Sequence, residues 1–118
     1  MRPVLLALLL ACPLLAWDPP TRTEWALEGA NLALMVVDWG QTLDLTNYSG
    51  RAYEQNPLLP RYPTRAQVNR HFIIGMGLHY LTFRALPHKF RTPFLIGTLT
   101  LQVACVNHNY RVGLRVTF

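Results

Sequence analysis

The sequence predicts an all-α protein, a small bundle of three helices at about 23–46, 65–86 and 93–109. Apolar residues recur with a helical period in each stretch, capping sequences precede them, and prolines separate them. A chain of 118 residues is enough for one domain. We expect residues 1–16 to be a signal peptide or membrane anchor and 17–22 a linker. Residues 23–118 then form a single helical domain that ends in a short extended tail.

The N-terminal segment is typical of bacterial export. Met1 and Arg2 precede an apolar run over residues 4–11, which is the pattern of a secretory signal. The residues just before Cys12 resemble a lipobox, so Cys12 is a candidate for lipidation. Cleavage after Ala16 by an ordinary signal peptidase and an uncleaved anchor are the alternatives.

The charges divide the chain into two halves. Residues 1–54 contain all six acids and three bases, a net charge of −3, whereas residues 55–118 contain eight bases and no acid. A basic half suits nucleic acid or an anionic membrane surface. The bases stand singly at the ends of apolar runs, which favours membrane lipids as partners. We expect no nucleic acid, and we keep protein partners or a homo-oligomer open.

Each helix carries a narrow stripe of polar or small residues. At 100° per residue the first helix aligns a set of mostly polar residues with Met35 among them: Glu24, Glu28, Asn31, Asp38 and Thr42. A solvated face is the default interpretation of that stripe. Asp38, however, follows the most apolar part of the helix and therefore needs a partner or water.

The second and third helices show similar stripes. A capping box over residues 64–67 starts the second helix, and Thr92 with Pro93 is expected to start the third. The stripe of the second helix consists of His71, Gly75, His79 and Thr82. That of the third consists of Thr98, Gln102, Cys105 and Asn109. Broad apolar faces beside narrow polar stripes predict a bundle packed on a polar seam with lipid outside, the alternatives being a soluble bundle or a subunit of a larger assembly.

The loop between the first two helices contains Glu54, the last acid of the chain, and Asn56, which precedes Pro57. Its prolines make it stiff and place Asn56 in an extended conformation. We expect this loop to hold a carboxylate near the polar seam. The predicted interhelical network consists of Asp38, Thr42, Glu54, Asn56, His79, Gln102 and Asn109.

Asp38, Thr42 and the stretch from Glu54 to Leu59 together resemble a group of small uncharacterised helical membrane proteins from bacteria and their phages. Members place an acid, any residue, Asn and Pro after a first helix that contains an aspartate. The helical hairpin after Pro63 is similar to that of phage-encoded members. The resemblance covers residues from about Leu34 onward and implies a location and an architecture, without implying an activity.

The leading functional hypothesis is a non-enzymatic envelope protein of the bacterial inner membrane, a phage- or prophage-encoded accessory protein that needs no cofactor or metal. One alternative is an intramembrane enzyme or metal-binding protein that uses Asp38, Glu54, His71 and His79. The two histidines lie eight residues apart, about 12 Å along a helix, which is too far for one ion. A second alternative is a partner-binding subunit of a lysis, exclusion or virion assembly.

Overall fold

The computed structural model describes residues 18–48 and 53–118, and its regular elements are all helical. Three long helices, α2 (Arg22–Leu45), α3 (Arg65–Ala85) and α4 (His88–Arg111), make up a bundle, with a short 3-10 helix η2 (Thr46–Tyr48) after α2. The prediction of an all-α, three-helix bundle is confirmed. The predictions about Cys12 and Ala16 lie outside the described residues.

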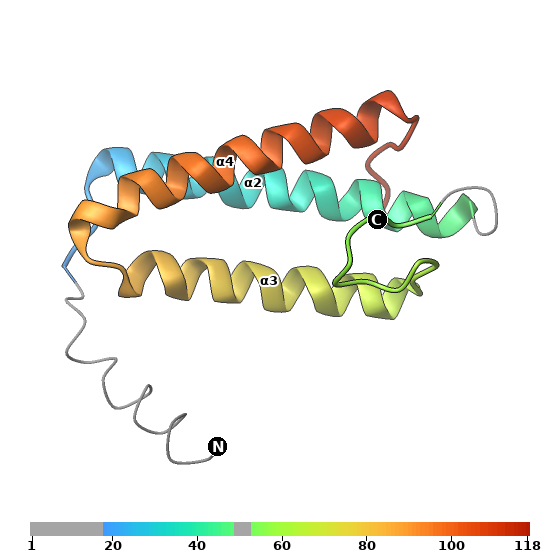
Figure 1. Ribbon diagram of the computed structural model, residues 1–118, viewed down its shortest axis with the longest axis horizontal. Coiled ribbons are helices and arrows are strands. Elements are labelled where there is room, and N and C mark those ends of the chain that lie inside the picture. The colour runs from blue at the N-terminus through green and yellow to red at the C-terminus, as the bar shows by residue number, and fades with distance from the viewer. Residues whose placement is uncertain (1–17, 49–52) are drawn as a thin grey trace, which may run out of the picture.

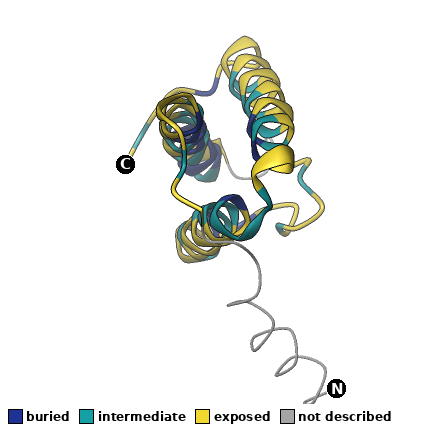
Figure 2. Ribbon diagram, turned by 90° about the vertical axis from the view of Figure 1, so that its left-hand side faces the viewer, coloured by how far each residue is buried: buried dark blue, intermediate teal, exposed yellow. Residues whose placement is uncertain are grey.

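The bundle is organised around α2. Helices α3 and α4 each pack against α2 along their length, whereas they touch each other little. Figure 1 shows α3 running antiparallel to the other two, and it shows α3 and α4 meeting at one end and separating toward the other. In the end-on view of Figure 2, the buried positions lie on the sides of the helices that face one another.

Capping boxes start two of the three helices. The Thr64 hydroxyl accepts from the Gln67 N–H and the Gln67 side chain accepts from the Thr64 N–H, as the sequence predicts. Thr21 and Glu24 make the same reciprocal pair at the start of α2. That helix therefore begins at Arg22, slightly before the expected position, because Glu24 has the side chain that closes the box.

Helix α4 begins earlier than the sequence predicts. Its first residue is His88, so Thr92 lies inside the helix and Pro93 interrupts its interior hydrogen bonding. The reason is Arg91, which is fully buried. Its guanidinium donates to the carbonyls of Leu86 and Arg84 at the end of α3, which fixes the connection and lets the chain turn directly into α4.

The C-terminal tail is extended, as predicted, and lies against α2. Gly113, with φ of 98°, ends α4 in a Schellman motif, in which Leu114 N–H donates to the Asn109 carbonyl. Leu114 is then buried, and the Thr117 N–H donates to the carbonyl of Gly40 at 3.1 Å. A Cβ on Gly40 would lie 2.6 Å from Val116, so only glycine allows this approach.

The apolar core is small, and large apolar side chains remain outside it. Leu43, Val68 and Phe72 form the buried cluster, with Trp39 packed on its edge. Helices α3 and α4 leave a set of large branched side chains exposed: Ile73, Ile74, Leu78, Leu81, Ile96, Leu101 and Val103. Over the described ranges, none of the helices has the combined length and apolarity required to cross a membrane.

Candidate functional site

The polar stripe of α2 faces the inside of the bundle. Glu24, Glu28 and Asn31 are at most 1% exposed, and Thr42 is also buried. The default interpretation of this stripe as a solvated face is therefore wrong. Its residues meet polar side chains of α3 and α4 in three clusters, which follow one another along the bundle.

The first cluster, called the Arg91 cluster here, consists of Glu24, His88 and Arg91. The Glu24 carboxylate lies 3.0 Å from His88 Nδ1 and 3.9 Å from Arg91 Nη1. Arg91 Nη1 also donates to the carbonyl of Asp18 at 2.8 Å. Because a buried charge is stable only with partners, the pairing of Glu24 and Arg91 explains how both are tolerated at nearly zero exposure.

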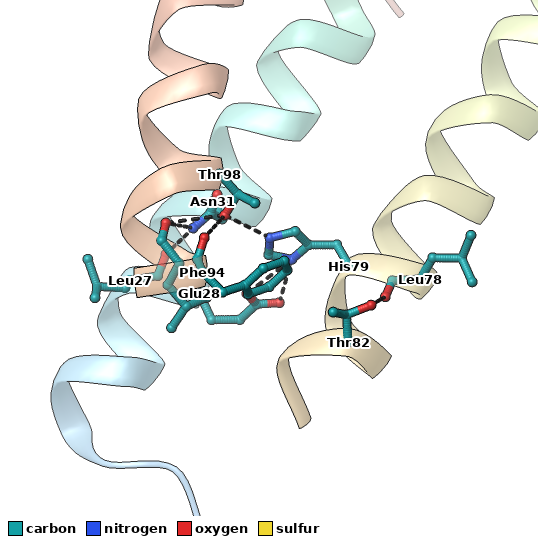
Figure 3. Close-up of polar contacts among 9 residues, drawn as sticks. Leu27, Glu28, Asn31, Leu78, His79, Thr82, Phe94 and Thr98 are labelled. Atoms are coloured by element: carbon teal, nitrogen blue, oxygen red, sulfur yellow. Dashed lines mark hydrogen bonds and ion pairs between the residues drawn. The ribbon is translucent and has the colours of Figure 1, made fainter. Parts of the chain in front are cut away.

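The second cluster, the His79 cluster, consists of Glu28, Asn31, His79 and Thr98 and joins all three helices (Figure 3). His79 Nδ1 lies 3.2 Å from a carboxylate oxygen of Glu28, and its Nε2 lies 3.2 Å from the Thr98 hydroxyl. Asn31 Nδ2 donates to the carbonyl of Leu95 on α4 at 3.0 Å.

The contacts of this second cluster satisfy both ring nitrogens of His79. The Thr98 hydroxyl lies within hydrogen-bonding distance of His79 Nε2 and of backbone carbonyls of α4, and the Glu28 carboxylate lies beside His79 Nδ1. Each buried polar group of the pair therefore has a partner on another helix.

The third cluster, the Asp38 cluster, consists of Asp38, Thr42 and Asn109. Asn109 Nδ2 donates to Asp38 Oδ1 at 2.8 Å, and Thr42 also hydrogen-bonds to the carboxyl group. Burial, and secondarily the negative charge of Glu54, raise the pKa of Asp38 from 3.8 to about 6. The two hydrogen bonds oppose this shift only in part. Asp38 is thus a carboxyl group that can exchange a proton near neutral pH.

The loop that contains Glu54 is held by its own hydrogen bonds and by α3. The Glu54 carboxylate accepts from the Asn56 N–H at 2.8 Å, and the Glu54 N–H donates to the Arg61 carbonyl. The Asn56 side chain lies 3.3 Å from His71 Nε2 on α3. The loop therefore connects to the bundle through Asn56 and His71, while Glu54 acts on Asp38 only through its charge.

Two further members of the α4 stripe, Cys105 and Gln102, make no side-chain hydrogen bond to the three clusters among the described residues. Burial and the charges of Asp38 and Glu54 raise the pKa of the Cys105 thiol, which keeps it protonated and weakly nucleophilic. Gln102 Oε1 is buried and accepts no hydrogen bond from the described residues. Within residues 18–48 and 53–118, no three His, Cys, Asp or Glu side chains are arranged to hold a metal ion.

The structure thus brings together some members of the predicted network and separates others. Asp38, Thr42 and Asn109 meet, and Asn56 meets Glu54, but His79 belongs to a separate cluster with Glu28.

The sequence pattern places Glu24, Glu28 and Asn31 on the right stripe, but its default interpretation assigns them to solvent, and Arg91 has no role in the predicted network. Helix α2 contains one base, Arg22, so its acids lack helical partners and must find them elsewhere. That is the signal that could have identified them.

Comparison with known proteins finds no family model, no curated protein and no solved structure that matches this chain.

Proposed function

We propose that the protein is a small, non-enzymatic envelope protein whose helical bundle presents its apolar outer faces to the lipid of the bacterial inner membrane. The phage or prophage origin that the Glu54-x-Asn56-Pro57 resemblance implies is part of this proposal. The proposal concerns the outside of the assembled bundle and does not require any helix to cross the bilayer.

The observation that carries the proposal is the inverted distribution of polar and apolar side chains. The bundle buries Glu24, Glu28, Asn31 and Arg91, residue types that are seldom fully buried in water-soluble domains. Arg91 is its largest fully buried side chain. Polar side chains that bond across helices while apolar ones face outward are the arrangement expected in a lipid environment.

The outer faces supply the complementary surface. On α3, Ile74, Leu78 and Leu81 stand at helical spacing and are 54%, 60% and 54% exposed. Leu101 on α4 is 66% exposed. Contiguous apolar faces of this kind mark sites that contact lipid or another protein. The eight bases and absence of acids in residues 55–118 favour an anionic surface as that contact.

The polar clusters then have a structural task. Each joins side chains from different helices, and the His79 cluster pairs α2, α3 and α4 at once. In an apolar environment the alternative for each group is to remain unpaired, so these contacts hold the helices in register. This supports the non-enzymatic class over an enzyme that uses Asp38 and His79.

Photo-crosslinking from the outer face tests the proposal. The photoreactive residue p-benzoylphenylalanine is introduced at Leu78 of the full chain in bacterial cells, and the products are analysed after illumination. We expect adducts with lipid. The matched control places the same residue at Leu58, which is 79% exposed on the loop, and we expect few lipid adducts there.

The design separates lipid from protein as the contact, because adducts are identified by mass. It also distinguishes lipid contact by the bundle from lipid contact by the N-terminal segment, since an anchor elsewhere in the chain would not bring Leu78 to lipid. If Leu78 yields only adducts with proteins, the partner-binding alternative replaces the present proposal.

A further inference from the structure

The bundle contains a second feature that the polar clusters do not explain, an apolar groove between α2, α4 and the C-terminal tail. It has a volume of about 520 Å³, which falls within the range of sites that bind small molecules. Its walls come from all three segments and are mainly branched aliphatic: Leu34, Val37, Val103, Val106, Leu114 and Val116.

The interior of the groove exposes almost no polar surface, and the amide of Gln41 is turned away from it. Gln41 is 3% exposed, and its Nε2 donates to the carbonyl of Val106 at 3.2 Å. An interior of Leu and Val methyl groups suits a flexible aliphatic chain better than a polar molecule. The chemistry of the interior therefore specifies a hydrocarbon tail.

A cation stands among the residues that line this groove. Arg115 is exposed, and one of its guanidinium nitrogens donates to the carbonyls of Tyr110 and Leu114, while the group stacks 4.1 Å from the Tyr110 ring centre. Among the described residues, no carboxylate forms an ion pair with it. The nearby carboxylate of Asp44 accepts from the Arg115 backbone N–H instead.

We propose that this groove binds one acyl chain of an anionic phospholipid, with Arg115 holding the phosphate. The pairing of an aliphatic interior with a positioned cation matches an anionic amphiphile in both shape and charge. The groove is open to the surface, which leaves room for the second acyl chain of a phospholipid to remain outside. The inference rests on the proposed contact with lipid and adds a specific binding site for one lipid molecule.

The experiment uses the full chain purified in a mild detergent and native mass spectrometry to count retained lipids. The probes are dioleoyl-phosphatidylglycerol, dioleoyl-phosphatidylcholine and free oleate. We expect one phosphatidylglycerol per chain and about a tenfold preference over phosphatidylcholine, the effect of one charged hydrogen bond at a partly exposed site. Equal retention of the two phospholipids would overturn the proposal, and so would a preference for oleate over phosphatidylglycerol.

Two variants test the charge. Arg115→Gln removes the cation while keeping the backbone hydrogen bond to Asp44, and we expect it to abolish the preference. Arg115→Lys keeps the charge and should retain most of the preference for phosphatidylglycerol. Arg111→Gln is the matched control, because this exposed arginine at the end of α4 does not line the groove. An equal loss of the preference in Arg111→Gln would show that the charge acts diffusely, which would contradict a phosphate contact at Arg115.

A second pair tests the groove itself. Val103→Trp places a large side chain in it from an exposed position, and we expect retention of both phospholipids to fall about tenfold. Leu101→Trp makes the same change outside the groove and should leave retention unaltered. Unchanged retention in Val103→Trp would refute binding in the groove. The helical circular dichroism of each variant verifies folding.

The outcomes also separate this inference from the proposed function. Lipid adducts at Leu78 without a preference for phosphatidylglycerol would refute the lipid-binding groove and leave the envelope proposal intact. A preference for phosphatidylglycerol in detergent without lipid adducts at Leu78 would leave the groove as a binding site and remove the envelope proposal.

Discussion

Replacing Asp38 by asparagine is expected to stabilise the protein at neutral pH. The pKa of Asp38 rises from 3.8 to about 6, mainly because burial disfavours its charged form. Each pKa unit is worth about 1.4 kcal/mol, so the cost of ionising the folded protein is about 3 kcal/mol, and partial exposure of the side chain reduces it to about 2 kcal/mol. The asparagine side chain keeps an oxygen that can accept from Asn109 and carries no charge.

The sign of the pH dependence follows from proton binding. Between pH 4 and 6, roughly the range bounded by the two pKa values, the folded protein holds a proton on Asp38 that the unfolded chain has released. The free energy of unfolding therefore falls as the pH rises through this range, and above it the full cost is present. The free energy of unfolding of Asp38→Asn should equal that of the wild type near pH 4 and exceed it by about 2 kcal/mol at pH 7.

Urea titrations followed by circular dichroism in a mild detergent, at a series of pH values, measure this difference. Asp18→Asn is the matched control, because that aspartate is exposed and should change neither the stability nor its pH dependence. Glu54→Gln should have a smaller effect in the same direction, since Glu54 is the second cause of the shift. An Asp38→Asn variant that is less stable at pH 7, or that keeps the wild-type slope between pH 4 and 6, would refute the reasoning.

Two further predictions concern the packing. Gly40→Ala should cost about 1–3 kcal/mol, because its Cβ would displace Val116 and the tail, and proteolysis should then remove the tail faster. Arg91→Ala should cost about 3–5 kcal/mol in urea titrations, since it removes the guanidinium beside the buried Glu24 and three hydrogen bonds to backbone carbonyls. Lys89→Ala on the exposed side of the same turn should cost little. An unaltered tail in the first variant, or equal losses in the second pair, would contradict these interpretations.

The helices could be predicted because their determinants are local. The Thr64 capping box and Pro87 act within a few residues of where they stand, so periodicity and cap chemistry place the helices closely. The start of α4 could not be predicted, because it depends on Arg91 reaching the carbonyls of Leu86 and Arg84, and that contact exists only once the hairpin has formed.

The polar contacts were partly predictable for the same reason. The stripes identify which side chains share a face, and they place Asp38 and Asn109 in one expected network. The partner of each residue depends on the axial offset between helices, which no local pattern encodes. His79 therefore meets Glu28, about three turns before the aspartate expected beside it, and the loop around Glu54 meets His71.

The central position of α2 has a consequence for the order of folding. Helix α2 is the first of the three described long helices to be synthesised, yet its acids Glu28, Asp38 and Asp44 meet side chains that lie 51 to 73 residues later, at His79, Asn109 and Thr117. The hairpin of α3 and α4 makes few internal contacts and cannot substitute for α2. The native bundle therefore forms only after α3, α4 and the tail have been synthesised. Until then, Glu24 and Glu28 on the nascent α2 must remain hydrated.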